Sequence, residues 1–524
     1  MAAPITPPST HWTKSLTLYS TFAILTSTLG PLQFGYHIAE LNAPQDALSC
    51  HTTIPSSPPS LSTTLNPTAG LPPCIPMGAF ALGLVTSTFT IGGLIGALSA
   101  GPLSTSQGRA PAMRLSAACF VLGSILEATA MNISAMAAGR FLSGLGAGAA
   151  LVVVPIFVAE VSPEEGRGRL GAATQIGIGL GVLGAVLMGY FFSEGGGVWR
   201  VILAVGVLLG GVYGLGLMGV DESPRWLVGK GRTEDARRAL GRLRRGGDVD
   251  GEIKGWAGRH DEEDTEEGAD DTVEEQEGLL SADAPKAGPN SNNTHHLHHQ
   301  HVGILEMLSL QRTRPALIAI LVAQSAQQLT GINSVIMYSV ALLSDLLPSA
   351  AALLTVLVAL TNLLGTLAFA PLIDSLGRKS CLLLSVATMG SSALALALAM
   401  TVGIPVLAGV ATLTFVMGFS MGLGPVPFML AAELVGPGAV GSLQSWGLGA
   451  NWVATFLVAQ LLPPLSLAVG KGGVYFLFTV LGVVYFGLVW VFVPETKGCR
   501  DSEAVWARFR DGRKKKGLGT DGGD

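Results

Sequence analysis

Long apolar runs recur along this chain, and short polar segments separate them. A helix needs roughly 20 apolar residues to cross a hydrocarbon core about 30 Å thick, and each run has about that length. The first six runs lie near residues 16–37, 78–100, 112–131, 137–159, 170–192 and 199–219. The second six lie near residues 315–343, 349–373, 380–402, 405–431, 440–465 and 473–493. The pattern predicts an all-α membrane protein with twelve transmembrane helices in two six-helix bundles.

A polar stretch separates the two sets. Residues 228–305 include the acidic run Asp261–Asp264 and the histidine-rich patch His295–His301. Such a stretch buries too little apolar surface to fold alone, so we expect a largely disordered linker. We interpret the patch as low complexity, and we expect no metal site and no cofactor. The predicted divisions are a tail at 1–15, a bundle at 16–219, a partly disordered linker at 220–314, a bundle at 315–493 and a tail at 494–524.

Composition and basic residues support a membrane location and indicate an orientation. The chain is 49% hydrophobic and 13% charged, which excludes an ordinary soluble protein. Lys and Arg gather in the loops on one side of the twelve-helix arrangement, whereas the loop at 40–77 contains neither. Basic residues are retained on the cytoplasmic side during insertion, so both termini and the linker are expected to be cytosolic.

Two of the five cysteines, Cys50 and Cys74, share the loop at 40–77. If this loop faces an oxidising compartment, the two thiols could form a disulfide. Spacing does not fix geometry, so the sequence leaves this pairing open.

Polar side chains inside the apolar runs are the first indication of function. An unpaired polar group in hydrocarbon is costly, so such residues usually face a cavity or a partner. Amides both donate and accept hydrogen bonds, which suits a solute that carries many hydroxyls. The alternative is that they join helices to one another, but their occurrence in both halves favours a binding site. The residues concerned are Gln33, His37, Glu40, Gln175, Gln324, Gln327, Gln328, Asn333, Asn362, Asn451 and Trp452.

Glycine and proline mark helix contacts and helix breaks. Glycines four residues apart, as at 92 and 96, 144 and 148, and 177 and 181, predict close helix crossings. Gly331 and Pro425 to Pro427 interrupt apolar runs. Broken helices can line a cavity and flex, so these positions are candidate gates, although a simple kink would give the same pattern.

Eight short motifs follow one another along the membrane portion of the chain. They are Leu32-Gln33-Phe34-Gly35-Tyr36 with Leu41-Asn42-Ala43-Pro44-Gln45, Gly139-Arg140-Phe141, Glu160 to Gly168, Glu222 to Leu227, Gln327 to Asn333, Asp374 to Lys379, Gly424 to Pro427 and Pro494 to Gly498. In this order they resemble the motifs of the sugar-porter branch of the major facilitator superfamily, and they are similar to those of facilitative glucose transporters and fungal hexose transporter-like proteins.

The resemblance implies two pseudo-symmetric bundles that rock about a central sugar site. By position, the sugar-binding residues would be Gln175, Gln327, Gln328, Asn333, Asn362 and Asn451, with Phe428 beside the proline pair. Trp452 would pack either against the sugar or against the bundle. A cytoplasmic charge network that latches the outward-facing state would comprise Glu160, Arg167, Glu222, Arg225, Asp374, Arg378, Glu433 and Glu495.

Four departures from the family pattern bear on the site and on the latch. Residues 105–110 lack the usual charged positions, which is expected to weaken the first half of the latch. Val440 stands where the family has an Arg that partners Glu433. Ser420 replaces a Glu, and Phe428 replaces a Trp. The site could therefore be shaped for a solute other than glucose.

The resemblance also raises the question of energy coupling. Proton-coupled members have an Asp where this chain has His37, and they pair it with the Arg that corresponds to Arg140. His37 can titrate near neutral pH and Glu40 lies one turn further on, so proton coupling is one possibility. In the other, His37 is a neutral hydrogen-bonding residue in a uniporter.

The expected partners are a sugar or polyol, the lipid bilayer and, in the coupled case, a proton. We expect a monomer that binds no nucleic acid, in the plasma membrane or the vacuolar membrane. A nutrient sensor or trafficking protein on a transporter scaffold is the alternative, with the linker as its interaction surface. No nucleophile or metal-ligand constellation at membrane depth supports an enzyme.

Overall fold

The computed structural model describes most of the chain outside the tails and the linker. The described residues are 16–50, 70–163, 170–171, 173–192, 198–245, 248–256, 306–343, 351–499 and 501–515. The histidine-rich patch and Arg167 lie outside them.

The first half forms six long helices within its described residues. They are α2 (Leu18–Ala39), α4 (Ala79–Gln107), α5 (Arg109–Ala128), α6 (Ile133–Val161), α8 (Ala173–Phe192) and α9 (Trp199–Met218). A capping box formed by Thr17 and Ser20 starts α2. Hydrophobicity predicts an end near residue 100 for the second of these helices, but α4 continues to Gln107, because backbone hydrogen bonding need not stop where apolar side chains do.

The second half contains helices broken near their middles. Its long helices are α14 (Arg314–Leu329), α15 (Ile332–Leu343), α16 (Ala351–Leu376), α17 (Arg378–Val402), α18 (Pro405–Met421), α19 (Val426–Leu434) and α20 (Pro437–Phe492). Gly331, with φ of 101°, separates α14 from α15. Pro425 caps the start of α19 after the break that follows α18. Both breaks lie where glycine and proline predict them. Gly470, with φ of 76°, divides α20 into two helices.

Ten helical segments among the described residues are long and apolar enough to span a membrane. Two other helices, α2 and the part of α20 before Gly470, are outside this set and are richer in polar residues. Both pack among the ten spans, α2 against α6 and α8, and α20 against α4. Counting them, the described chain has the all-α architecture of twelve transmembrane helices that the sequence predicts.

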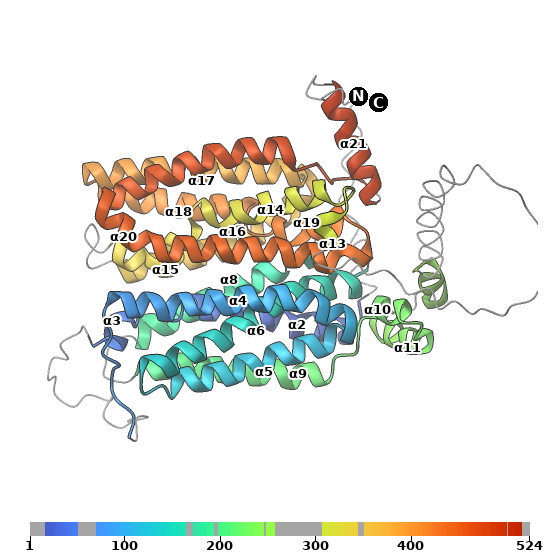
Figure 1. Cartoon of the computed structure of the whole chain (residues 1–524), viewed down its shortest axis with the longest axis horizontal. Coiled ribbons are helices and arrows are strands. Elements are labelled where there is room, and N and C mark those ends of the chain that lie inside the picture. Colours follow the sequence, from blue (N-terminus) through green and yellow to red (C-terminus); the bar gives the residue numbers. More distant parts are fainter. Residues whose placement is uncertain are drawn as a thin grey trace, which may run out of the picture.

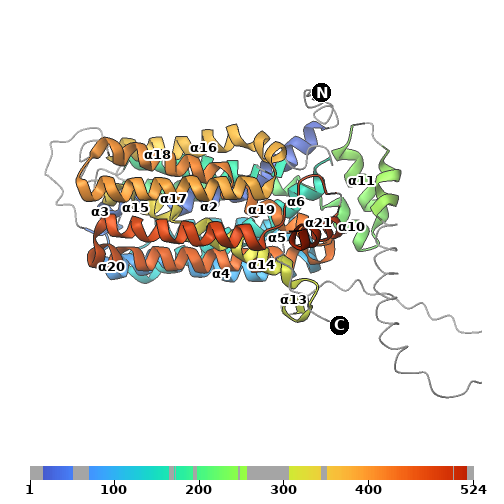
Figure 2. The same ribbon diagram turned by 90° about the horizontal axis from the view of Figure 1, so that it is seen from above.

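The helices of the two halves lie side by side, roughly parallel to one another (Figure 1). Their interface includes contacts of α4 with α20 and of α8 with α16. The short helices α10 (Pro224–Gly229) and α11 (Thr233–Leu243) lie at one end of the bundles with α21 (Ser502–Lys515), and α3 (Gln45–Leu48) lies at the other, as Figure 2 also shows. We call these the α10–α11 end and the α3 end.

Two features of the connections refine the sequence analysis. Cys50 and Cys74 form a disulfide at the α3 end, which resolves the pairing left open by their spacing. The polar stretch that begins at residue 228 is helical over Thr233–Leu243, whose Ala236, Ala239 and Leu240 are buried. This helix was missed because its apolar positions are few and five of its eleven residues are charged, namely Glu234, Asp235, Arg237, Arg238 and Arg242.

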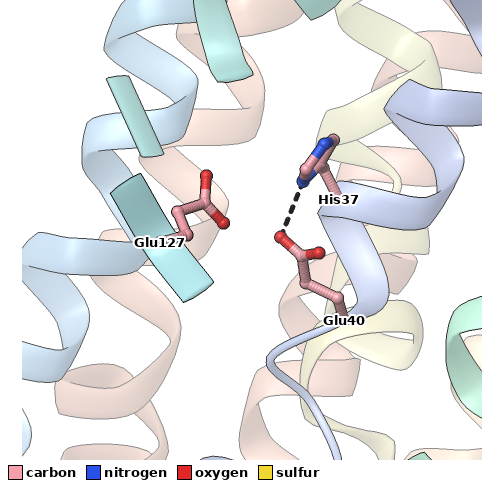
Figure 3. Close-up of side chains that lie close together, drawn as sticks. All are labelled: His37, Glu40 and Glu127. Carbon is pink, nitrogen blue, oxygen red and sulfur yellow. Dashed lines mark hydrogen bonds and ion pairs between the residues drawn. The ribbon is translucent and has the colours of Figure 1, made fainter. Parts of the chain in front are cut away.

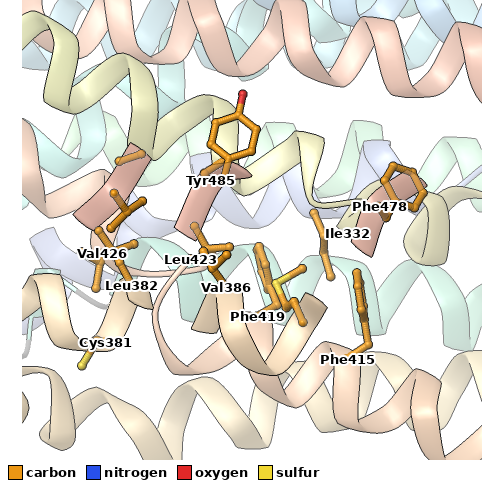
Figure 4. Packing of buried hydrophobic residues seen from close by; sticks show 14 of the residues in the cluster. Ile332, Cys381, Leu382, Val386, Phe415, Phe419, Leu423, Val426, Phe478 and Tyr485 are labelled. Atoms are coloured by element: carbon orange, nitrogen blue, oxygen red, sulfur yellow. The ribbon is translucent and has the colours of Figure 1, made fainter. Parts of the chain in front are cut away.

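Buried apolar residues form one large cluster in each half. The second-half cluster surrounds the break after α18, where Phe415, Phe419 and Leu423 pack near Leu382 and Val426 (Figure 4). The first-half cluster also includes Trp452 and Phe428 from the second half. The two halves therefore share apolar packing where these side chains cross between them.

The predicted glycine crossings are present. A Cβ on Gly92 or Gly96 in α4 would clash with backbone of α6, and one on Gly148 would clash with backbone of α4. In α8, a Cβ on Gly181 would clash with the carbonyl oxygen of Leu32 in α2. These glycines permit the close approach of helix backbones that lipid-embedded packing uses.

The α2–α8 crossing gives the first prediction. Gly181→Ala should lower the thermal unfolding temperature in detergent, because overpacking of a well-packed contact costs about 1–3 kcal/mol. Gly184→Ala in the same helix is the matched control, since its nearest heavy atom would be Tyr36 Cδ2 at 3.9 Å. Equal unfolding temperatures for the two variants would contradict the crossing.

Candidate functional site

Four amide side chains of the second half form a hydrogen-bonded network where α14, α15 and α20 meet. Gln328 Nε2 donates to Asn451 Oδ1 at 3.1 Å, and Asn451 Nδ2 donates to Gln327 Oε1 at 2.6 Å. Asn333 Nδ2 donates to Gln328 Oε1 at 2.6 Å. All four side chains are buried. We call Gln327, Gln328, Asn333 and Asn451 the amide network.

The broken helix α18–α19 supplies further acceptors to this network. Gln327 Nε2 donates to the carbonyl oxygens of Leu423 at 2.6 Å and Gly424 at 3.1 Å. Gln324, which precedes the network in α14, donates to the carbonyl oxygen of Pro427 at 3.3 Å. The break exposes these carbonyl groups because no helix continues through residues 422–425.

Gln175 from the first half meets the network at the same break. Its side chain is 3% exposed, and a Cβ on Gly424 would lie 3.4 Å from Gln175 Cδ. Amides of both halves therefore converge on Gly424. Asn362 is also buried, but its partner is Ser420, whose Oγ donates to Asn362 Oδ1 at 3.1 Å. The structure thus brings together five of the six predicted amides and places Asn362 in a separate contact with α18.

Trp452 and Phe428 pack across the two halves. The Trp452 ring is 5.6 Å from the Phe34 ring and 5.7 Å from the Phe89 ring, both edge to face, and it covers Gly93 in α4. Phe428 in α19 is buried and belongs to the first-half apolar cluster. These contacts show bundle packing for both residues, while Trp452 also follows Asn451 directly in the chain.

A second polar cluster lies inside the first half, toward the α3 end. His37 lies in α2, Glu40 directly follows it and Glu127 lies in α5, and Figure 3 shows these three side chains close together. Arg140 comes from α6. Arg140 Nη1 lies 2.7 Å from Glu40 Oε1 and 3.8 Å from Glu127 Oε2. His37 Nδ1 lies 2.7 Å from the same Glu40 oxygen. We call these four side chains the charged cluster.

The structure adds Glu127 to the three residues that the sequence analysis selected here. Its side chain is fully buried, and Ser143 Oγ donates to its Oε1 at 2.6 Å. An acidic residue within the apolar run of 112–131 was the signal that could have identified it. It was missed because the family motifs do not include this position.

The ligating atoms of His37, Glu40 and Glu127 all lie within 4.8 Å of one another, a grouping that could by residue type hold a metal ion. However, Arg140 already donates to Glu40 Oε1 at 2.7 Å and to the His37 carbonyl oxygen at 2.9 Å. The positive guanidinium group stands where a cation would have to bind, so the arrangement is that of an ion-pair cluster.

The latch residues form one ion-pair motif in each half at the α10–α11 end. In the first half, Arg109 donates to Glu160 through Nε at 2.9 Å and Nη2 at 2.7 Å. Glu222 accepts from the backbone N–H groups of Arg109 at 2.8 Å and Ala110 at 3.1 Å. Burial raises the pKa of the Glu222 carboxyl, while these backbone donors oppose that shift.

The second half repeats this geometry. Arg378 Nη2 lies 2.8 Å from Glu433 Oε1, and Glu495 accepts from the backbone N–H groups of Arg378 at 2.8 Å and Lys379 at 3.1 Å. Gly108 and Gly377, with φ of 107° and 96°, precede the two arginines. Both adopt a conformation that favours glycine and turns the arginine backbone toward the carboxylate.

Arg109 corrects the expectation that residues 105–110 weaken the first half of the latch. It makes the same bidentate contact as Arg378 and was absent from the predicted network because its meeting with Glu160 depends on how α5 and α6 pack together. Thr496 Oγ1 donates to Glu433 at 2.6 Å. This gives Glu433 a further partner although Val440 stands where the family pattern has an Arg that pairs with this carboxylate. Of the other predicted latch residues, Arg225 lies in α10 and Asp374 in α16. The side chain of Asp374 is outside the described part of the structure.

Comparison with known proteins agrees with this architecture. Residues 22–504 match the family model described as sugar (and other) transporter. A probable metabolite transport protein, YBR241C of Saccharomyces cerevisiae, is 34% identical over 93% of this chain and 94% of its own length. Vacuolar protein sorting-associated protein 73 of the same yeast is 31% identical over 91% of this chain and 93% of its own.

A solved structure shows the same fold. The proton:xylose symporter XylE, bound to 6-bromo-6-deoxy-D-glucose, superposes with a TM-score of 0.72 at 23% sequence identity, covering 94% of this chain and 99% of XylE. At that identity the likeness establishes the fold. The fold is therefore that of the major facilitator superfamily. The family match over nearly the whole chain shows that the protein is a membrane transporter, not an enzyme, and that it belongs to the sugar (and other) transporter family.

Proposed function

We propose that the protein carries a monosaccharide or a polyol across its membrane by alternating access, and that the amide network with Gln175 binds the solute. The convergence of amides from both halves on Gly424 is the observation that supports this most strongly. Each amide offers donors and an acceptor, so the network can exchange its internal hydrogen bonds for bonds to hydroxyls. That exchange costs little because few hydrogen bonds are lost in total.

Buried polar atoms near this network support the same assignment. Within the described residues, Trp452 Nε1 and Thr174 Oγ1 are buried without a hydrogen-bond partner. Thr174 and Trp452 are the chain neighbours of Gln175 and Asn451. Unsatisfied buried polar groups are rare, and a solute with several hydroxyls would satisfy groups such as these.

The latch motifs and the broken helices provide the moving parts of this proposal. Ion pairs at the α10–α11 end would fix the helix ends of each half in the positions that close that end. The breaks at Gly331 and before Pro425 would allow α15 and α19 to move separately from α14 and α18. Sugar binding would shift the equilibrium between the two states only through a difference in affinity for them.

A second candidate function is a sensor or trafficking protein that no longer transports. The resemblance to a yeast protein named for vacuolar protein sorting favours keeping it. Its interaction surface would be the polar stretch of residues 228–305, of which residues 246–247 and 257–305 lie outside the described part of the chain.

Counterflow of labelled sugar in proteoliposomes tests the transport function. We expect labelled hexose, pentose or polyol to accumulate transiently against an unlabelled load of the same compound. A folded protein that gives no counterflow with any of these compounds would rule out the proposal and favour the second candidate.

Substitution of the amide network should weaken sugar binding selectively. Gln328→Ala or Asn333→Ala should raise the counterflow KM by roughly tenfold to a hundredfold, since a lost hydrogen bond to a solute hydroxyl costs about 1–3 kcal/mol. Gln33, whose Nε2 donates to the Gly206 carbonyl oxygen at 2.7 Å, is a buried amide outside the network. Gln33→Ala is the control and should lower stability rather than affinity. Unchanged KM in the network variants would show that these amides only join helices.

Neutralising the latch should open the α10–α11 end. Cys introduced at Ser445, which is buried where α20 meets Gly101 of α4, reports this opening through its rate of alkylation. We expect Glu160→Gln and Glu433→Gln to accelerate alkylation several-fold, because each removes the charge opposite an arginine. Glu234→Gln, at an exposed ion pair with Arg237, should leave the rate unchanged. Equal rates in all three variants would refute a latch at this end.

We further propose that the α10–α11 end faces the cytosol, in the plasma membrane or the vacuolar membrane. The disulfide at the opposite end supports this orientation, since disulfides persist in oxidising compartments. A protease added outside sealed cells meets the non-cytosolic face of the plasma membrane and should then leave a tag placed after α21 intact. A protease added to intact vacuoles meets the cytosolic face of the vacuolar membrane and should digest the tag. Digestion from the other side would reverse the assigned orientation.

A further inference from the structure

The charged cluster is separate from the sugar-binding amides and has a role of its own to explain. Its four side chains come from α2, α5 and α6 and are at most 1% exposed. Charged groups inside a membrane protein are costly, and they are retained mainly where they serve a function. A bundle contact alone could be made by apolar residues at lower cost.

The charge balance of the cluster requires one proton more than its ion pairs supply. Glu40 and Glu127 are two carboxylates, and Arg140 is one guanidinium group. With both carboxylates ionised and His37 neutral, the cluster would carry an uncompensated negative charge in a water-poor interior, which is strongly unfavourable. With one proton on the carboxylates, the cluster is neutral.

The geometry leaves room for that proton. Arg140 Nη1 and His37 Nδ1 both lie against Glu40 Oε1, and Ser143 donates to Glu127 Oε1. Among the described residues, Glu40 Oε2 and Glu127 Oε2 are buried oxygens without a hydrogen-bond partner. Either oxygen can carry the proton while Arg140 compensates the other carboxylate.

One charged group on a neighbouring helix lies close to the cluster. Arg200 of α9 donates to the carbonyl oxygens of Ala128, the residue after Glu127, and of Pro72, each at 2.8 Å, so its described partners are backbone groups rather than the two carboxylates. From α4, Phe89 places its ring 4.4 Å from the Arg140 guanidinium carbon. From α5, Ser124 Oγ lies 3.3 Å from His37 Nε2, and Phe120 stacks on the His37 ring. On α2, the Tyr36 hydroxyl donates to the Ile202 carbonyl oxygen of α9 at 2.6 Å. Among these described neighbours, His37 is therefore the group, besides the two carboxyls, whose protonation would change the net charge of the cluster.

We propose that Glu127 shares one exchangeable proton with Glu40 and that this proton binds and leaves once for each sugar carried, an inference that rests on the proposed transport function. Binding forms one O–H bond on a carboxylate as a hydronium ion becomes water, and release reverses this step. Arg140 remains charged throughout and pairs with whichever carboxylate is ionised. Glu127 thus makes the site a carboxylate pair rather than a single acid opposite an arginine.

A continuous series of contacts joins this proton site to the sugar site. The Arg140 guanidinium group packs on the Phe89 ring, and Phe89 contacts Trp452 at a ring separation of 5.7 Å. Trp452 follows Asn451, which donates to Gln327 in the amide network. A shift of Arg140 between the two carboxylates would therefore displace rings that pack directly against the sugar site.

Infrared titration of the purified protein tests the shared proton without requiring transport. We expect a protonated carboxyl band whose intensity rises as the pH is lowered. Glu127→Gln and Glu40→Gln should each abolish its titration, because the remaining acid then pairs with Arg140 as a permanent ion. Glu127→Asp keeps an acid at this position and should keep the band, which guards against loss of the fold. Glu234→Gln, at an exposed carboxylate, should leave it unchanged. A titration identical in Glu127→Gln and the unsubstituted protein would overturn the proposal.

Uptake driven by a pH gradient tests the coupling to sugar. One proton per sugar predicts about tenfold accumulation for one pH unit, since the free energy per unit corresponds to a factor of ten. Glu127→Gln should lose this accumulation while retaining measurable counterflow. Counterflow without any pH-driven accumulation in the unsubstituted protein would overturn the coupling and leave the proposed transport function standing. Absence of counterflow as well would overturn the transport function itself.

Discussion

Polar groups within the membrane-spanning helices must find their hydrogen-bond partners inside the protein, because lipid offers none. The second half meets this constraint with amides that bond to one another and to carbonyl groups freed by the break at residues 422–425. Partners held in this way are also exchangeable, since a hydroxyl-rich solute offers the same kinds of donor and acceptor. The requirement that stabilises the closed core is thus the one that suits it to bind a sugar.

Pseudo-symmetry shows how one local solution serves both halves. Gly108 and Gly377 each turn the chain so that an arginine reaches a carboxylate on a helix of its own half, Glu160 or Glu433. The following backbone N–H groups then bind a second carboxylate, Glu222 or Glu495. The amides and the charged cluster lack this symmetry. The amides lie mainly in the second half of the chain, whereas the charged cluster lies wholly in the first half. In the proposed mechanism, gating is therefore duplicated between the halves, whereas sugar binding falls mainly to the second half and proton binding to the first.

Sequence reasoning was most effective where chemistry is local. Apolar run length predicted the twelve helices, and glycine spacing predicted close helix crossings on α4, α6 and α8, although not the helices that they meet. Gly331 and Pro425 marked the helix breaks because their backbone requirements are intrinsic. The partners of individual side chains were harder to predict, since they depend on how separate helices are placed. Glu127 meets Arg140, and Arg109 meets Glu160, only after α5 and α6 pack together.

The central claim is that the amide network binds a small polyhydroxylated solute, and equilibrium binding tests it most directly. A ligand that binds only the native state raises its apparent stability. Thermal unfolding of the purified protein should therefore be measured against hexoses, pentoses, polyols and disaccharides at saturating concentrations. The account predicts a concentration-dependent rise in unfolding temperature with at least one monosaccharide or polyol. A folded, monodisperse protein whose unfolding temperature is unmoved by every one of these compounds would contradict it.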